Sequence, residues 1–241
     1  MDSALWDAIA RVERRHWWFR GRREIVAEVL RRRLPAGARI VDVGCGTGFV
    51  LERLLDDFDA TGLEPDASVR ARAADGVRGR ILPGSTDDLS AIPPGSADAV
   101  LLLDVLEHLD DDVAALRAVT PLLRPGGFVL MTVPALPALW SSHDVRNEHR
   151  RRYTRRSLVE TIRQAGLVPT LVRWFNTRLF PLAMVHRTLG RLTGHASERE
   201  LALPPAALNE WLFRTFSGEG ARLGHGLPVG LSLLATAEPA R

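Results

Sequence analysis

The chain of 241 residues contains no lysine, one tyrosine and one cysteine. A single cysteine, Cys45, excludes an internal disulfide and favours a reducing compartment. No apolar run reaches the ~18 residues of a membrane span. The opening residues MDSALWDAIARVERR carry early acids and lack the apolar stretch of a signal peptide. These absences predict a cytoplasmic protein without a membrane-spanning segment.

The missing lysines also explain the high sequence pI of about 10.2. The formal net charge is only +3. Because arginine keeps its proton to high pH and few other groups titrate above neutral pH, that small charge persists. The pI therefore does not indicate the large basic surface of a nucleic-acid-binding protein, and we expect no nucleic-acid partner.

The most informative stretch is VDVGCGTG at residues 41–48, which follows an apolar strand predicted over residues 38–43. Its glycines lack side chains and can take positive φ, so the backbone can approach a ligand closely. An acid, Glu64, follows a second predicted strand, residues 60–63. A carboxylate about 20 residues after such a loop is placed to bind the two hydroxyls of a ribose. The pairing predicts a ligand that contains a nucleoside.

The spacing of the glycines is not that of a dinucleotide-binding loop. In G-x-G-x-x-G the last glycine would fall on Phe49 or Leu51. The chain has G-x-G-x-G instead, with Asp42 two residues before the first glycine. This pattern resembles motif I of the class I S-adenosylmethionine-dependent methyltransferases. The resemblance implies an α/β fold with a doubly wound, seven-stranded, mostly parallel sheet, and S-adenosyl-L-methionine as cofactor.

The resemblance covers roughly residues 10–175 and the last strand, and is nearest to the quinone-biosynthesis-type small-molecule methyltransferases. The resemblance predicts the third strand and the loop after it within 81–89, and the fourth strand and the turn after it within 97–111. Further strands are predicted at 128–135, 168–175 and 227–236. Where many relatives have an acid, this chain has Ser85, so the adenine contact falls to backbone near Thr86 or to Asp87.

The resemblance implies a set of cofactor-binding residues in the glycine loop and at the strand ends that follow it. These residues are Asp42, Gly44, Cys45, Gly46, Gly48, Glu64, Pro65, Thr86, Asp87, Leu103, Asp104 and His108. For His108 the alternative is a buried, hydrogen-bonded structural histidine.

The chemistry is predicted in residues 140–154, directly after the fifth strand. Methyl transfer is an in-line displacement, so an enzyme must mainly orient the acceptor and exclude water. A hydroxyl or ammonium acceptor also needs a base, usually histidine. The candidates are His143 and His149, with Asp144 to orient an imidazole. The alternative is that these residues only tie the loop to the next helix.

A metal held by His143, Asp144 and His149 is disfavoured, because no third carboxylate or cysteine cluster accompanies them. We therefore expect no metal.

The domain is expected to have an N-terminal helical cap (1–34), a cofactor-binding core (35–175), a helical lid (176–226) and a last strand with a tail (227–241). The predicted substrate pocket consists of Trp18, Phe19, Arg22, Trp140 and Tyr153.

Two details of the cap are open. Adjacent helical residues point about 100° apart, so one of Trp17 and Trp18 should enter the core and the other the pocket. Arg20 and Arg22 are candidate partners for the methionine carboxylate.

The lid should contain two amphipathic helices, within 176–192 and 205–223, separated by a polar stretch at 193–200. Their apolar faces suit a hydrophobic acceptor, a peripheral membrane contact through 176–216, a homodimer interface or ordinary core packing.

The arginine-rich segment HRRRYTRR (149–156) opens a helix that Thr154 can cap. We expect its arginines on a solvated face, the alternative being an anionic group of the acceptor at the substrate mouth.

Taken together, the residues predict an S-adenosylmethionine-dependent methyltransferase that acts on an oxygen or nitrogen of a small molecule. One alternative is a non-catalytic protein that binds the cofactor and serves in assembly. The other is an RNA-directed methyltransferase that uses the 149–156 segment. The lack of a separate RNA-binding domain and of an Asn/Asp-Pro-Pro-Tyr motif weighs against the latter.

Overall fold

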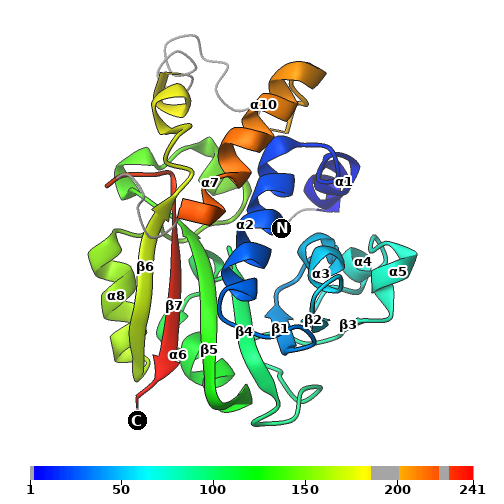
Figure 1. The fold of residues 1–241 in the computed structure, drawn as a ribbon, viewed down its shortest axis with the longest axis vertical. Helices are drawn as coiled ribbons and strands as arrows, with labels where there is room; N and C mark the ends of the chain where they lie inside the picture. Colours follow the sequence, from blue (N-terminus) through cyan, green and yellow to red (C-terminus); the bar gives the residue numbers. More distant parts are fainter. Residues whose placement is uncertain (1–2, 186–200, 223–227, 241) are drawn as a thin grey trace.

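A computed structural model describes residues 3–185, 201–222 and 228–240 (Figure 1). Its centre is a seven-stranded sheet in the order β3-β2-β1-β4-β5-β7-β6. The strands are β1 Arg39–Val43, β2 Asp59–Leu63, β3 Ile81–Leu82, β4 Ala97–Leu103, β5 Leu123–Pro134, β6 Leu167–Phe175 and β7 Ser232–Pro239. Strands β1 to β5 pair in parallel, and β7 is antiparallel to both β5 and β6. The predicted fold class is confirmed.

Helices cover both faces of the sheet. They are α1 Ser3–Val12, α2 Trp17–Arg31, α3 Phe49–Leu54, α4 Ala67–Arg70, α5 Asp75–Arg78, α6 Asp112–Val119, α7 Ser142–Arg146, α8 Arg155–Gln164 and α10 Ala206–Ser217. Short 3₁₀ turns are η1 Leu106–His108, η2 Thr120–Leu122, η3 Pro137–Leu139 and η4 Gly220–Arg222. One core lies between the sheet and α6 and α8, and the other between the sheet and α2, α3 and α10. Because β4 is covered on both faces, all of its residues are buried and its sequence ADAVLLL is almost wholly apolar.

The strand order reverses between β1 and β4, since β2 and β3 continue to one side and β5 to the other. Open α/β sheets place their ligands at the carboxyl ends of the strands near such a reversal. In Figure 1, α1, α7 and α10 lie above the sheet at this edge.

Strands β5 and β7 differ most from their predicted bounds. Strand β5 begins at Leu123 rather than at residue 128. Strand β3 ends at Leu82 because Pro83 cannot donate to a ladder, and the rest of 81–89 is the loop predicted there. The last strand begins at Ser232 rather than at residue 227. A Cβ atom on Gly230 would lie 2.5 Å from the Phe175 carbonyl oxygen, so the chain crosses the end of β6 before β7 begins.

The two helices predicted between β6 and β7 are present as far as the described residues extend. Residues 180–185 are helical, and α10 occupies the second predicted segment. The rest of the first predicted helix (186–192) and the polar stretch 193–200 lie outside the described residues. None of the helices in the described ranges is long and apolar enough to cross a membrane.

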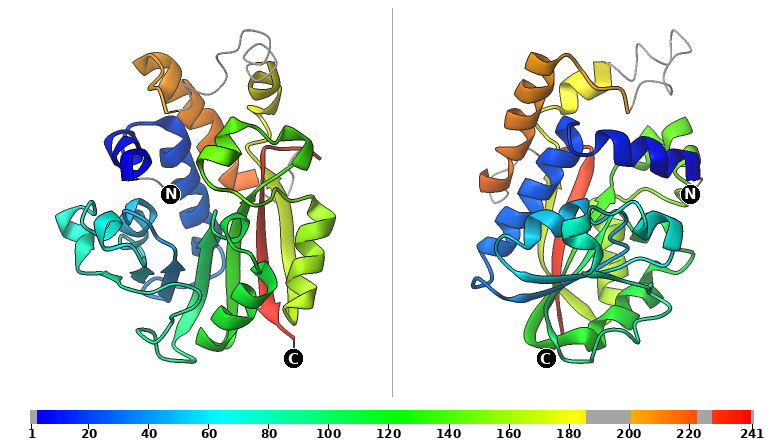
Figure 2. Two further views of the ribbon diagram at one scale, coloured as in Figure 1. Left: turned by 180° about the vertical axis from the view of Figure 1, so that it is seen from behind. Right: turned by 90° about the vertical axis from the view of Figure 1, so that its right-hand side faces the viewer.

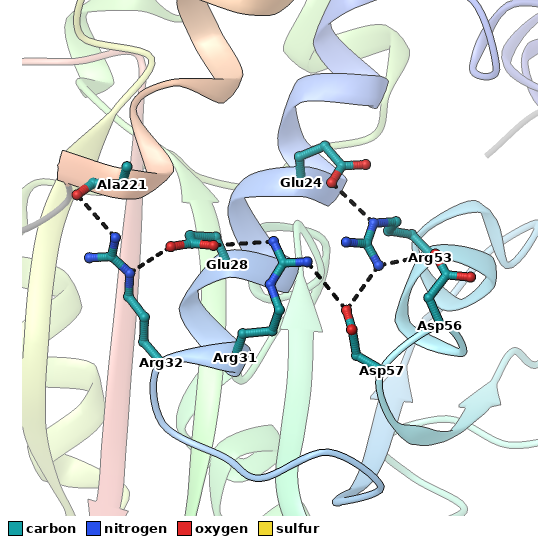
Figure 3. Close-up of polar contacts among 8 residues, drawn as sticks. All are labelled: Glu24, Glu28, Arg31, Arg32, Arg53, Asp56, Asp57 and Ala221. Carbon is teal, nitrogen blue, oxygen red and sulfur yellow. Dashed lines mark hydrogen bonds and ion pairs between the residues drawn. The ribbon is translucent and has the colours of Figure 1, made fainter.

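Figure 3 shows how the outer side of α2 is tied to its neighbours. Arg53 of α3 donates from Nε to Glu24 at 3.0 Å, and Arg32 donates to the Ala221 carbonyl at 3.2 Å. The complete network consists of Glu24, Glu28, Arg31, Arg32, Arg53, Asp56, Asp57 and Ala221. Exposed pairs of this kind each contribute only about 0–1 kcal/mol, so the network orients α2 more than it stabilises it.

Helix α10 packs against α2, as both views of Figure 2 show. A Cβ atom on Gly21 would lie 2.4 Å from the Phe216 ring, so this glycine allows the close approach. Asn209 accepts from the Trp17 backbone N–H at 2.9 Å and donates to the Arg15 carbonyl at 2.8 Å. The cap and the lid therefore form one packed layer above the carboxyl edge of the sheet.

Candidate functional site

A cavity of about 1410 Å³ lies between the carboxyl edge of the sheet and the layer of cap and lid helices. Small-molecule pockets usually measure about 300–1,000 Å³. The cavity is thus large enough for two ligands side by side.

Most of the predicted site residues line this cavity. They are Asp42, Gly44, Cys45, Gly46, Glu64, Pro65, Thr86, Leu103, Asp104, His108, His143, His149, Trp18, Phe19 and Arg22. Trp17 lines it as well, so the expectation that only one of the two tryptophans would do so is wrong. Both rings also pack against the core beside α2.

Five predicted residues are not among those that line the cavity: Gly48, Asp87, Trp140, Asp144 and Tyr153. Gly48 precedes α3 with φ 76° and packs against Ile81. Asp87 lies in the exposed turn between Ser85 and Asp88, and Trp140 is 39% exposed.

Tyr153 is buried in the core rather than in the pocket where the sequence predicted it. Its backbone bridges Ala135, and its hydroxyl donates to Asp112 at 2.7 Å. Burial and this hydrogen bond raise the pKa of Tyr153 well above its usual value. Aromatic character alone could not distinguish the two positions.

The glycine loop and Glu64 form one hydrogen-bonded unit. Gly44, Gly46 and Gly48 have φ of 78°, 58° and 76°. The Gly46 N–H donates to Glu64 Oε2 at 3.1 Å, and the Asp66 N–H donates to Oε1 at 3.0 Å. Burial raises the pKa of Glu64 while these hydrogen bonds oppose the shift. Each oxygen keeps a lone pair for a further donor.

Beside the loop lies a group of charged side chains with unused hydrogen-bonding atoms. Asp42 is 2% exposed and its Oδ1 has no partner. Burial raises the pKa of Asp42 to about 7, although Arg22 opposes the shift. Arg22 pairs with Asp104 at 3.0 Å, and its Nε has no partner. Arg20 is instead paired with Glu210 of α10 at 3.1 Å, away from the cofactor side.

Helix α1 covers the glycine loop. Thr47 Oγ1 donates to both carboxylate oxygens of Glu13, at 2.9 and 2.8 Å. A Cβ atom on Gly46 would lie 3.0 Å from the Trp6 ring. Asp7 pairs with Arg72 of the segment after α4 at 2.7 Å. The loop is therefore covered by the N-terminal segment, and both Trp6 and Glu13 are cavity residues that the sequence analysis did not identify.

Three histidines come together in another part of the cavity wall. His149 Nδ1 lies 2.9 Å from Asp144 Oδ1. The His149 ring is 4.8 Å from the His108 ring and 5.9 Å from the His143 ring, measured between centroids. Burial and the neighbouring His149 lower the pKa of His108 to about 4.

Asp144 is the buried anchor of this wall. It accepts from the Ser141 N–H at 2.8 Å and from Arg152 Nε at 2.7 Å, as the first residues of α7 close a capping box. Burial would raise the pKa of Asp144, but the hydrogen bonds from His149 and Arg152 lower it well below its usual value. Asp144 thus remains a carboxylate. Its hydrogen bonds hold both the loop after β5 and the His149 imidazole in place.

The arginines of the 149–156 segment are only in part on the solvated face that we expected, because Arg150, Arg155 and Arg156 are exposed whereas Arg152 is buried. Arg150 Nε donates to the His108 carbonyl at 2.9 Å, and Arg151 donates to the Leu109 carbonyl at 2.9 Å. Arg152 is buried and donates to the Ala135 carbonyl at 3.0 Å. The segment therefore holds the turn after β4 against the loop after β5. Thr154 caps α8 as predicted.

One three-residue group within the described ranges has the geometry of a metal site. Single donor atoms of Glu107, His108 and His149 all lie within 4.8 Å of one another. Glu107 is fully buried, both its carboxylate oxygens lack partners, and burial together with Asp104 raises its pKa well above the usual value. This set differs from the one considered from the sequence, which was His143, Asp144 and His149. In the structure Asp144 of that earlier set is paired with Arg152. The absence of a resident metal stays a prediction.

The sequence matches known proteins over its core. Residues 14–172 match the family model described as a methyltransferase domain. A ubiquinone biosynthesis O-methyltransferase of Xanthomonas axonopodis pv. citri (strain 306) is 40% identical over 114 residues, covering 44% of this chain and 48% of the relative. Another, from Xanthomonas oryzae pv. oryzae (strain PXO99A), is 38% identical over 114 residues, covering 44% of this chain and 47% of the relative. The chain thus spans about half the length of these relatives.

Solved structures share the fold across nearly the whole chain. A SAM-dependent methyltransferase from Thermotoga maritima aligns with a TM-score of 0.59 and 19% identity, covering 98% of this chain and 100% of that one. Phosphoethanolamine N-methyltransferase 2 of Haemonchus contortus, in complex with S-adenosyl-L-methionine, aligns with a TM-score of 0.58 and 17% identity, covering 90% of this chain and 52% of that one.

Proposed function

The chain belongs to the methyltransferase-domain family, and we propose that it transfers the methyl group of S-adenosylmethionine to an oxygen or nitrogen of a small-molecule acceptor. One observation carries the proposal. A glycine loop joined to a ribose-type carboxylate and a carboxylate-anchored histidine line the same cavity.

The residues present fit S-adenosylmethionine. Each oxygen of Glu64 has a lone pair left for a ribose hydroxyl. Asp42 Oδ1 and Arg22 Nε are buried without partners, and they complement an ammonium and a carboxylate, the two charged groups of an amino acid. When bound, the cofactor supplies a methyl group on a sulfonium. The glycine loop allows close contact with it, and α1 keeps water away.

His149 is the proposed general base, and Asp144 the residue that positions it. Nδ1 of His149 donates to the ionised Asp144, so Nε2 carries the lone pair that takes the proton of the acceptor. Arg152 holds Asp144 in place from its other side. This arrangement favours His149 as the base, because its Nδ1 faces a buried carboxylate, while the His143 imidazole has the Asn147 amide at 3.3 Å.

The acceptor should have an apolar part. The side of the cavity below the lid is lined by Leu179, Leu182, Leu208 and Leu212. We therefore propose a hydrophobic or amphipathic small molecule, which agrees with an O-methyltransferase among the relatives. The anchored His149 speaks against the non-catalytic alternative. The use of Arg150 to Arg152 as loop braces speaks against an RNA-binding surface there.

Titration calorimetry with S-adenosylhomocysteine, with NAD as the control, tests the cofactor. We expect micromolar binding of the former and none of the latter. Mass-spectrometric screening of hydroxyl and amine acceptors with S-adenosylmethionine then tests transfer. Binding of NAD alone, or of neither compound, would refute the proposed function.

A further inference from the structure

Asn176, directly after β6, is a buried polar residue of the cavity wall that the proposed reaction does not use. It is 2% exposed, it lines the cavity, and its Oδ1 has no hydrogen-bond partner. An unpaired buried amide oxygen is destabilising, so a folded protein rarely retains one without a use for it.

The backbone at Asn176 is held firmly in an uncommon conformation. Its φ is 56°, in the left-handed region that asparagine tolerates better than most residues. The buried carboxylate of Glu219, just after α10, accepts from the Thr177 N–H at 3.0 Å and from the Arg178 N–H at 2.8 Å. The lid therefore fixes the residues that follow Asn176.

The start of β7 holds Asn176 from the other side. The Leu231 N–H donates to the Asn176 carbonyl at 3.4 Å. Gly230 passes so close to the end of β6 that a Cβ atom would lie 2.5 Å from the Phe175 oxygen. Hydrogen bonds and close contacts fix the chain on both sides of Asn176, so loose local packing does not explain why its Oδ1 is unpaired.

The sheet register places Asn176 relative to the reacting groups. Pro134 at the end of β5 pairs with Ser232, and Ser232 pairs with Phe175. Neighbouring strands lie about 4.8 Å apart, so the end of β6 is roughly 10 Å across the sheet from the end of β5, where the loop to His149 begins. The glycine loop follows β1, which lies on the opposite side of β5 in the strand order. His149 packs on His108, which follows β4 between β1 and β5, so an acceptor beside His149 has the cofactor on one side and Asn176 on the other.

We propose that Asn176 is a specificity-determining residue that accepts a hydrogen bond from a second hydroxyl or amino group of the acceptor, at the end remote from the methylated atom. The inference rests on the proposed function, since it takes this cavity as the acceptor site. The substrate class is a molecule with two protic groups joined by an apolar framework. One group loses its proton to His149, and the other donates to Asn176 Oδ1.

Binding of matched probes to the protein saturated with S-adenosylhomocysteine tests the inference without requiring turnover. The probes are hydroquinone and 4,4′-biphenol, which place their hydroxyls at a shorter and a longer spacing, each compared with its mono-O-methyl ether. Calorimetry should show that the wild-type protein binds at least one diol about 5- to 100-fold more tightly than its ether, because the single hydroxyl of the ether can pair with Oδ1 or with His149 but not with both.

Two variants separate recognition from folding. Asn176→Gly accepts a positive φ and removes the amide, so the preference for the diol should vanish. Asn176→Asp keeps an acceptor oxygen at the same place, so the preference should remain. A merely structural role for Asn176 would change stability or both affinities together and leave their ratio unchanged.

The inference is overturned if the wild-type protein prefers neither diol, or if Asn176→Gly retains the preference. Failure of the proposed function looks different, because S-adenosylhomocysteine itself would not bind.

Discussion

The two ends of the cavity are built in different ways. The cofactor end is largely backbone from one contiguous stretch, residues 42–66, with Gly44 and Gly46 at positive φ and amides that donate to Glu64. The acceptor end consists of side chains from distant segments, among them His108, His149 and Asn176. A site of backbone is disrupted when atoms are added to it, whereas a site of side chains is disrupted when atoms are removed.

Removing the His149 imidazole should have the largest effect. His149→Ala removes the proposed base, and we expect turnover to fall by about 10²–10⁴-fold, the usual contribution of general base catalysis. Affinity for S-adenosylhomocysteine should stay within about twofold, because the proposed cofactor contacts come from the glycine loop and Glu64 and not from His149. Initial rates by mass spectrometry and calorimetric titration measure the two quantities.

His143→Ala is the matched control, since it removes an imidazole from the same wall that lies beside the Asn147 amide. Its turnover should fall by less than about tenfold. Equal losses of only a few-fold in both variants would show that the enzyme acts by orienting its acceptor and without a histidine base.

Adding atoms to the glycine loop should have the next largest effect. The Gly46→Val side chain would project from a residue with φ 58° toward the Trp6 ring, into the space proposed for the cofactor. Overpacking of about 3 kcal/mol corresponds to a roughly 100-fold loss of S-adenosylhomocysteine affinity. Calorimetry measures the loss.

Gly37→Val separates this steric effect from backbone strain. Gly37 has φ 76°, and a Cβ atom there meets nothing within 4 Å. Both valines suffer the left-handed strain of about 1–2 kcal/mol. Only Gly46→Val should lose the cofactor, and comparable losses in both variants would mean that strain is the cause.

The same contrast explains which features the sequence could predict. The glycine loop, the run ADAVLLL of β4 and the Thr154 cap of α8 are encoded by neighbouring residues, and all were predicted. Strand and helix patterns are local, so the order of elements could be deduced. The division of the chain into cap, core, lid and tail stays a prediction.

The acceptor wall offered no comparable local signal. The position of Asn176 depends on Glu219 and on Gly230, both far along the chain. Tyr153 resembled a pocket residue, yet its hydroxyl finds Asp112 in the core. Arg152 belongs to an arginine run typical of a solvated face, but it is buried against Asp144. Such partners are known only once the chain is folded.

Removal of the ribose carboxylate should have an intermediate effect on the cofactor end. Glu64→Ala removes two acceptor oxygens and leaves the Gly46 and Asp66 N–H groups without their partner. We expect S-adenosylhomocysteine binding to weaken by about 1.5–3 kcal/mol, the range for hydrogen bonds to a charged group. Glu28→Ala, on the outer side of α2, is the control. Unchanged affinity in Glu64→Ala would remove Glu64 from the site.

The smallest expected effect is a pH dependence that originates at Asp42. Burial raises the pKa of Asp42 from 3.8 to about 7, so the folded protein without ligand prefers the protonated form. An ammonium beside Oδ1 requires the carboxylate. Affinity for S-adenosylhomocysteine should therefore rise with pH through 7, by up to about tenfold between pH 6 and pH 8.

Asp42→Asn should flatten this profile, because the amide has no proton to release. The same substitution should raise the stability of the unligated protein above neutral pH, although it lowers the affinity for S-adenosylhomocysteine. A raised carboxyl pKa makes the unligated protein less stable as pH rises from about 4 to 7, since the buried group must ionise. Asp42→Asn should thus be more stable than the wild-type protein at pH 8 while binding the cofactor product less tightly. Parallel pH profiles for the two proteins would mean that Asp42 does not contact the ligand, and that the cofactor end binds through its backbone and Glu64 alone.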